Sequence, residues 1–231
     1  GKYYQSYNMT FIEPWFGGKK PNSLAVSFFH SIMNNSYTIW DAGTSSMKIT
    51  GASIGLGRRL TWPDDFFTLY NEISFQQYNL DNWTGYFQFT DGFSNNISFN
   101  TTLARKSIDQ LIYPRRGSDF SLSLQLTPPY SAFNNKDYSN LSSEDRYRWI
   151  EYHKWLFRAD WYTSLAGNLV LATRAHFGYL GHYNNDLGPS PFEGFDVGGD
   201  GMSGYNIYGY DVIALRGYEN GSLTPRVKGT K

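Results

Sequence analysis

The sequence predicts an all-β protein, an antiparallel sheet that forms part of a transmembrane β-barrel, and three observations support this fold class. From Phe120 to Thr127, apolar residues occupy every second position and Ser, Gln and Thr occupy the others, as expected of a strand with one apolar and one polar face. The aromatic content is 19%, and membrane barrels place aromatic residues in girdles at both lipid–water interfaces. Short and long connections also alternate along the chain, as in barrels with short periplasmic turns and long extracellular loops.

Eight segments show this period of two residues, and each is predicted to be one strand. In chain order they are Tyr3–Ile12, Ser23–Ser31, Lys48–Arg58, Phe67–Gln77, Asn96–Ala104, Phe120–Thr127, Trp155–Thr163 and Leu169–Tyr179. In the same order, the residues assigned to the lipid face are Tyr7, Met9 and Phe11; Leu24, Val26 and Phe28; Ala52, Ile54 and Leu56; Leu69, Ile73 and Phe75; Ile97, Phe99 and Leu103; Phe120, Leu122, Leu124 and Leu126; Trp155, Phe157 and Trp161; and Leu171, Ala175 and Phe177.

The composition of the polar face favours a membrane barrel over a soluble sheet. The exposed face of a soluble β-sandwich usually carries many Lys and Glu residues, whereas this face is built mainly from Ser, Thr, Asn and Gln. Charged residues are few on it, and examples are Glu72, Arg158, Asp160 and Arg174. Such groups can hydrogen-bond to one another in a narrow, water-filled lumen. The sequence therefore predicts that the apolar face meets lipid and the polar face lines the lumen.

The connections between the predicted strands fall into two classes. Turn-like segments rich in Gly, Pro or Asn occupy residues 17–22, 58–65 and 166–168. Longer polar segments occupy residues 31–46, 79–94 and 130–151. We expect the short segments at the periplasmic end of the sheet and the long ones at the extracellular end.

Composition excludes several other classes of protein. Twenty basic and twenty acidic residues cancel, so no nucleic-acid partner held by bulk charge is expected. The absence of cysteine excludes a disulfide scaffold and a thiolate metal site. The four histidines lack ligand spacing, so no metal site and no cofactor are predicted. No apolar run is long enough for a helical membrane span.

Two aromatic clusters lie between predicted strands, at residues 83–89 and 146–155. We interpret them as anchors at the membrane interface, with a carbohydrate-stacking platform as the alternative.

Three segments carry a resemblance to a known family. YPRRGSDFSLSLQLTPPYS (Tyr113–Ser131) and YQSYNMTFIEPWF (Tyr4–Phe16) resemble strand regions of the BamA family of outer-membrane assembly barrels, in the form found in Bacteroidetes. LRGY (Leu215–Tyr218), preceded by PFEGFDVGGD (Pro191–Asp200), is similar to the family's loop signature and its approach. The order and spacing of the three matches make the resemblance specific, and it extends over nearly the whole chain.

The resemblance implies where the chain lies in the family's sixteen-stranded barrel. Residues 1–231 would form a partial barrel domain running from about strand three to strand ten and into the sixth extracellular loop. POTRA domains and closing strands would lie outside it. We expect the chain to be an interior portion of a longer protein, with open edges at its first and last strands.

The resemblance also implies a function. The family's barrel is the central subunit of the outer-membrane β-barrel assembly machinery, which folds and inserts outer-membrane proteins through a lateral seam. The expected partners are therefore the lipid bilayer, nascent outer-membrane β-barrel proteins and accessory assembly lipoproteins or other envelope subunits, and the expected location is the outer membrane of a Gram-negative bacterium. No bond is made or broken, so no enzymatic activity is expected.

The site residues implied by the resemblance lie in and around the loop signature: Arg216, Gly217 and Tyr218, supported by Gly198 and Gly199. In the family the arginine folds into the barrel and pairs with acidic groups on later strands of the inner wall. Within this chain, Glu72 and Asp160 are the candidate partners.

Three alternatives remain open at this stage. One is a related translocation or two-partner secretion barrel, which shares an Arg-Gly-Tyr or Arg-Gly-Phe loop. Another is a passive outer-membrane channel or nutrient transporter. The third is a soluble, aromatic-rich β-sandwich that binds glycans.

Overall fold

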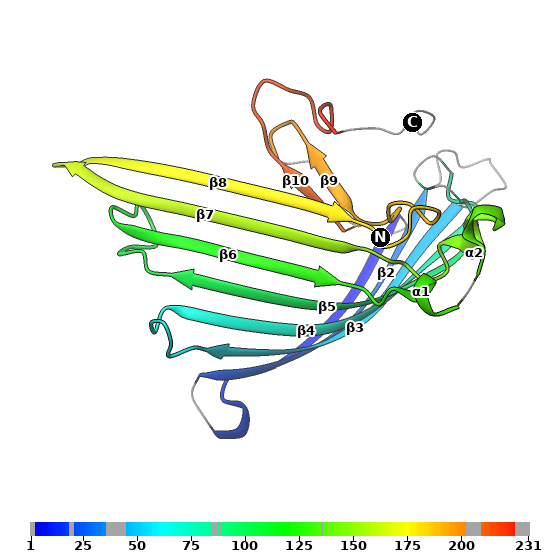
Figure 1. Cartoon of the computed structure of the whole chain (residues 1–231), viewed down its shortest axis with the longest axis horizontal. Coiled ribbons are helices and arrows are strands. Elements are labelled where there is room, and N and C mark those ends of the chain that lie inside the picture. The colour runs from blue at the N-terminus through cyan, green and yellow to red at the C-terminus, as the bar shows by residue number, and fades with distance from the viewer. Residues whose placement is uncertain are drawn as a thin grey trace.

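The computed structural model describes residues 3–18, 21–35, 45–84, 87, 89–134, 136–201 and 209–224. Eight strands form one antiparallel sheet in which each strand pairs with the next along the chain (Figure 1). They are β1 (Tyr4–Glu13), β2 (Asn22–Asn35), β3 (Ser45–Arg59), β4 (Phe67–Asp81), β5 (Gly92–Lys106), β6 (Gly117–Leu126), β7 (His153–Ala166) and β8 (Leu169–Gly181). All eight predicted strands are confirmed. The sheet is curved and not closed, with β1 and β8 at its two edges.

The strand register confirms the two predicted faces. One row across the sheet is apolar and consists of Phe11, Val26, Ile54, Ile73, Phe99 and Leu126. The adjacent row on the other face is polar and consists of Thr10, Ser27, Ser53, Ser74 and Ser98. Because register is fixed, the alternation within each strand builds continuous apolar and polar surfaces.

At the centre of the sheet, burial on the two faces is the reverse of that in a soluble protein, whereas both faces of the edge strands β1 and β8 are largely exposed. Ile73 is 55% exposed, whereas the next residue, Ser74, is 8% exposed. The Ser74 hydroxyl lies 2.8 Å from that of Ser98. Soluble proteins rarely expose an apolar surface of this extent, and such surfaces mark contacts with membranes or partners. The outer face of the sheet therefore suits lipid.

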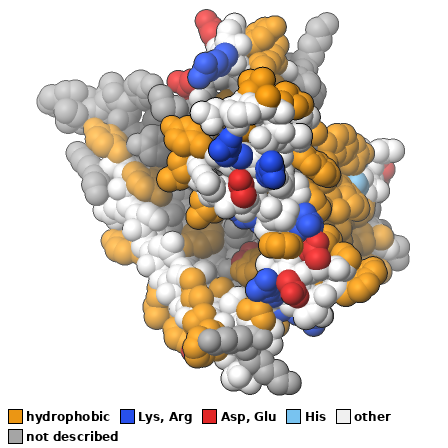
Figure 2. Space-filling view, turned by 90° about the vertical axis from the view of Figure 1, so that its left-hand side faces the viewer, with side chains coloured by type: hydrophobic (Ala, Val, Ile, Leu, Met, Phe, Trp, Pro, Cys, Tyr) orange, Lys and Arg blue, Asp and Glu red, His pale blue; other side chains and the backbone are white. Residues whose placement is uncertain are grey.

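The connections at the two ends of the sheet overlap in length, contrary to the prediction, because residues 107–116 at the end with the predicted short turns form a connection as long as residues 82–91 at the other end. Residues 14–21, 60–66, 107–116 and 167–168 connect strands at one end, and residues 36–44, 82–91 and 127–152 connect them at the other. Residues 36–44, which make up most of the predicted connection at 31–46, lie outside the described residues. Figure 2 looks onto the end of the sheet that carries residues 60–66, 107–116 and 167–168, where charged side chains gather and apolar side chains lie along the flanks.

Several strands continue beyond the predicted ends toward the long connections. The prediction ended them too early because the polarity of their two faces inverts there. Lys48 and Asn79 are paired across β3 and β4 on the outer face and are exposed. The inward neighbours Met47, Ile49 and Tyr78 are buried. The strands thus leave the apolar band with polar groups outside and apolar groups inside, as in water.

These inverted strand ends form one side of a hydrophobic core, which the long connections and the segment after β8 complete. Its buried members are Met47, Ile49, Tyr78, Leu80, Trp83, Phe89, Tyr138, Tyr147, Ile150, Tyr152, Leu187 and Phe192. The connection from β6 to β7 contributes short helical turns, α1 (Tyr130–Asn134), η2 (Tyr138–Asn140) and α2 (Ser143–Arg146), and η1 (Phe16–Gly18) follows β1. Among the described residues, no helix is long and apolar enough to cross a membrane.

The interpretation of the two aromatic clusters as interface anchors is wrong for the aromatic residues that are buried in the hydrophobic core. Trp83, Phe89 and Tyr147 belong to the hydrophobic core and are almost inaccessible. Trp149 and Trp155 remain partly exposed. Packing of long loops against one another thus uses aromatic residues that the sequence pattern assigned to the interface.

Two short strands lie outside the large sheet. β9 (Gly194–Val197) and β10 (Tyr210–Ile213) pair in parallel, with Asp211 opposite Phe195. They belong to the segment that follows β8, and this segment turns back beside β7 and β8 (Figure 1).

Candidate functional site

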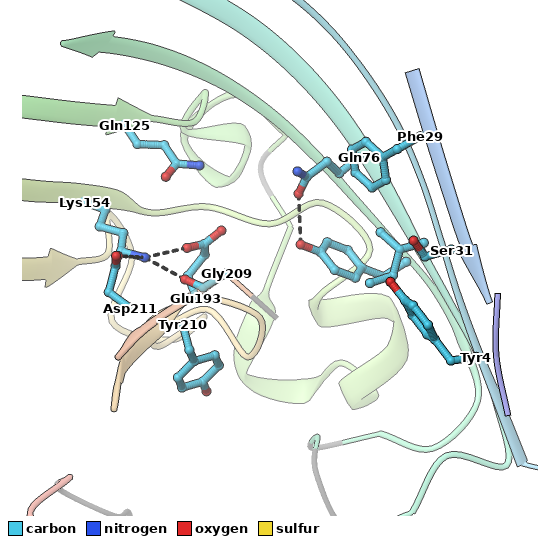
Figure 3. Close-up of a pocket in the computed structure, with 12 residues that line it drawn as sticks. Tyr4, Phe29, Ser31, Gln76, Gln125, Lys154, Glu193, Gly209, Tyr210 and Asp211 are labelled. Carbon is cyan, nitrogen blue, oxygen red and sulfur yellow. Dashed lines mark hydrogen bonds and ion pairs between the residues drawn. The ribbon is translucent and has the colours of Figure 1, made fainter. Parts of the chain in front are cut away.

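The candidate site lies where the segment after β8 packs against the polar face of the sheet. We call residues 182–201 and 209–224 the return segment; it contains β9, β10 and the Arg-Gly-Tyr sequence. Its contact with the wall is centred on Lys154, which begins the inner face of β7 (Figure 3).

The Lys154 ammonium group binds three acceptors of the return segment. Its Nζ lies 3.0 Å from Glu193 Oε2, 2.8 Å from Asp211 Oδ2 and 2.6 Å from the Gly209 carbonyl oxygen. An ammonium group has three N–H donors, so its hydrogen-bonding capacity is filled. Lys154 is 4% exposed and Glu193 is 5% exposed. This is a buried ion pair in which every donor of the lysine is satisfied.

Glu193 is also linked to β5 and β6 through Tyr152, the residue that precedes β7. Its Oε1 accepts a hydrogen bond of 3.1 Å from the Tyr152 hydroxyl. That hydroxyl in turn accepts hydrogen bonds from Asn96 of β5 at 3.1 Å and from Gln125 of β6 at 2.6 Å. Burial raises the pKa of the Glu193 carboxyl, and the nearby Lys154 charge opposes this rise.

Further contacts surround the ion pair. The Phe195 ring has its centroid 5.4 Å from Lys154 Nζ, an arrangement in which the ring face attracts the cation. Arg158 Nη2 lies 3.7 Å from Asp211 Oδ1. The four charged groups therefore comprise two cations and two anions, and the cluster is neutral.

A cavity of about 490 Å³ opens beside the cluster, between the return segment and the wall (Figure 3). Ser31, Gln76, Gln125 and Tyr210 contribute to its lining together with the charged cluster. Because the Lys154 donors are already occupied, the cavity offers amides and hydroxyls rather than a free cation. This chemistry suits water better than a charged ligand.

The structure places the predicted signature at the far end of β9 and β10. The Leu215 amide donates a 2.9 Å hydrogen bond to the Gly199 carbonyl, and the Gly198 amide donates one of 3.0 Å to the Ile213 carbonyl. Arg216, Gly217 and Tyr218 follow in an exposed turn. The structure thus brings Gly198 and Gly199 against the signature segment.

The candidate partners of Arg216 lie on the inner wall, but the structure does not bring Arg216 to them. Glu72 accepts hydrogen bonds from Tyr70 at 2.9 Å and from Asn100 at 3.3 Å. Asp160 Oδ1 lies 3.5 Å from Arg174 Nε and 3.8 Å from His176 Nε2. Within the described residues, no ion pair joins Arg216 to either carboxylate. The inward pairing of Arg216 stays a prediction.

Sequence reasoning missed Lys154, Glu193 and Asp211. The predicted strand began at Trp155, one residue after the lysine. Glu193 lies within the PFEGF motif, but the sequence analysis gave it no functional role. The available signal was a lysine at an inward position of a face that is otherwise poor in lysine.

The packing of Gly199 supports a first prediction. Gly199 has φ +84°, and a Cβ added there would overlap the Asn220 side chain; Gly217 has φ +90° and open space around it. A left-handed φ costs a non-glycine residue on the order of 1–3 kcal/mol, so both alanine variants are strained, but only Gly199→Ala also clashes. We expect faster hydrogen–deuterium exchange across residues 209–224 in Gly199→Ala than in Gly217→Ala. Equal exchange in the two variants would show that Gly199 does not hold this segment.

The family model described as the Omp85 superfamily domain matches residues 1–231. No curated protein matches the chain. Among solved structures, the chain is similar to BamA from Haemophilus ducreyi lacking POTRA domains 1–3, with a TM-score of 0.58 and 19% sequence identity. The match covers 83% of this chain and 35% of that one. The chain thus spans about a third of the length of the structure it resembles, and the likeness shows a shared barrel-wall fold.

Proposed function

The chain belongs to the Omp85 superfamily, and from this membership we propose that it forms part of the barrel of a BamA-type protein, the central subunit of an outer-membrane assembly machinery. In this role the barrel folds and inserts outer-membrane β-barrel proteins into the outer membrane of a Gram-negative bacterium. Its partners are the lipid bilayer, the nascent barrel proteins and accessory subunits of the envelope.

One observation carries the proposal: the sheet exposes its apolar face and holds a long return segment on its polar face. Ile73 is exposed while Ser74 is buried, which fits a wall between lipid and lumen. The ion pairs of Lys154 with Glu193 and Asp211 then fix the Arg-Gly-Tyr-bearing segment on the lumenal side. The lumenal position of this segment, together with membership of the Omp85 superfamily, supports an assembly role.

The physical problem that such a barrel solves is backbone desolvation. A strand that enters the bilayer alone leaves its N–H and C=O groups without partners, and each unsatisfied group costs several kcal/mol. Pairing with an exposed strand edge satisfies these groups as the strand arrives. In the proposed mechanism this chain supplies fixed wall and the return segment, and the seam that opens lies on strands outside it. The process makes and breaks hydrogen bonds, so it needs neither a catalytic group nor a cofactor.

Charge reversal at Arg216 tests the proposal. We expect Arg216→Glu, introduced into the full-length protein, to destabilise the inward pairing of the loop, because a hydrogen bond between charged groups contributes about 1.5–3 kcal/mol. Cells that depend on this variant should show slow growth and reduced amounts of folded outer-membrane proteins, measured by heat-modifiable migration. Arg216→Lys keeps the charge and should be milder.

Normal growth and normal outer-membrane protein levels with Arg216→Glu would contradict the proposal. A large ionic conductance that Arg216→Glu leaves unchanged would favour a passive channel. Secretion of a specific exported protein, with unaltered barrel assembly, would favour a secretion barrel of the same superfamily.

A further inference from the structure

The buried Lys154 cluster has a specific place in the architecture of the return segment. Of the residues that the structure describes, Lys154 is the only buried basic residue. It lies on the wall, and its two carboxylate partners lie on the return segment. Removing one partner of a buried ion pair is strongly destabilising, because the other charge is left without compensation. The cluster therefore favours one position of the return segment on the wall.

The two carboxylates mark the beginnings of two adjacent strands. Glu193 immediately precedes β9, and Asp211 is the second residue of β10. The strands are parallel, with Tyr210 opposite Gly194 and Asp211 opposite Phe195. One ammonium group therefore holds the same end of both strands.

The other end of the same two strands carries the signature. β9 continues into Gly198 and Gly199, and β10 continues into Leu215 and Arg216. The bridge between Gly199 and Leu215 joins the strands at this end. Because the two strands form one hydrogen-bonded unit, the position of Arg216 depends on where Lys154 fixes the start of that unit.

The chemistry of the cluster favours an anchor over a ligand site. The three donors of Lys154 meet three acceptors at 2.6–3.0 Å. Arg158 adds a second cation at 3.7 Å from Asp211, so the group is neutral without any added ion. A binding site for an anion would instead present unsatisfied donors.

We propose that Lys154 is a positioning residue, which fixes the return segment to the lumenal wall through Glu193 and Asp211 and so sets the position of Arg216. The inference rests on the proposed assembly function. Lys154 is then a second anchor of the β9–β10 unit, in addition to the predicted pairing of Arg216, and it lies at the end of the unit opposite to the Arg-Gly-Tyr signature.

The test uses the full-length protein in lipid vesicles, with spin labels at Gln110 in the connection between β5 and β6 and at Glu219 in the return segment. Both positions are exposed. We compare Lys154→Met, which keeps the length and removes the charge, with Lys106→Met. Lys106 pairs with Asp119 at 2.9 Å in an ion pair that is exposed at the turn end, and it serves as the matched control. The distance distribution between the labels is measured together with the rate at which an unfolded outer-membrane protein inserts.

We expect Lys154→Met to broaden the distance distribution and to slow insertion on the order of tenfold, which corresponds to about 1.4 kcal/mol. Lys106→Met should change neither quantity. Lys154→Arg keeps a cation facing Glu193, Asp211 and the Gly209 carbonyl and should retain a narrow distribution, whereas a role of the apolar stem of Lys154 alone would not distinguish arginine from methionine. Heat-modifiable migration confirms that each variant is folded, and Asp211→Asn replaces Lys154→Met if that variant does not fold.

An unchanged, narrow distance distribution in Lys154→Met would overturn the inference, and so would a distribution in Lys154→Arg as broad as that in Lys154→Met. If the unmodified protein itself does not accelerate insertion, the proposed function fails. The distances still report on the anchor in that case, so the two failures are distinguishable.

Discussion

Phe192→Ala is expected to lower the local stability of the return segment by about 3–5 kcal/mol, the usual cost of truncating a fully buried phenylalanine. Phe192 is 0% exposed. Its ring stacks on Tyr78 of β4 with centroids 4.2 Å apart and lies 4.6 Å from that of Phe87. The substitution removes the aromatic contact between the return segment and Tyr78, at the residue just before Glu193.

Hydrogen–deuterium exchange across residues 182–201 measures this local opening free energy in the full-length protein. Phe133→Ala is the control, since Phe133 lies in α1 and is 78% exposed. The control should leave exchange unchanged. Equal protection of residues 182–201 in both variants would mean that the aromatic stack does not hold the return segment.

Leu124→Arg is expected to destabilise the folded barrel by about 2–4 kcal/mol near the bilayer midplane, the range measured for basic residues on the lipid face of such barrels. Leu124 lies opposite Thr101 and Trp155 on the outer face of β6. Its neighbour Ser123 faces inward, where its hydroxyl lies 2.9 Å from that of Thr102. Ser123→Arg places the same charge in the lumen and should cost less.

Urea titrations of both variants in lipid vesicles give the two unfolding free energies under identical conditions. A smaller loss for Leu124→Arg than for Ser123→Arg would mean that the two faces are assigned the wrong way round. Equal losses would mean that neither face meets lipid.

The eight strands and their faces could be predicted from the sequence because a period of two is a local property. In a strand such as Phe120–Leu126, the polarity of each residue indicates whether it faces lipid or the lumen. The parts of β3 and β4 that extend beyond Lys48 and Gln77 were harder to predict, because the apolar residues there lie on the inner face of the sheet. A prediction based on one continuous alternation of apolar and polar residues places the end of the strand where that alternation changes face.

The centre of the candidate site depends on contacts between distant parts of the chain. Lys154 and Asp211 are far apart in sequence and meet only because the return segment folds back over β7. β9 and β10 have four residues each and pair in parallel, so they carry little periodic signal. The signature itself was visible in the sequence, because Arg-Gly-Tyr and the preceding glycines are contiguous motifs.

The most direct test of the account is the insertion of an unfolded outer-membrane β-barrel protein into vesicles that contain the full-length protein, compared with empty vesicles of the same lipid. Cold electrophoresis separates the folded from the unfolded substrate and gives the rate. We expect faster insertion with the protein present and loss of most of this acceleration with Arg216→Glu. An insertion rate equal to that of empty vesicles, from a protein that is itself folded in the bilayer, would contradict it.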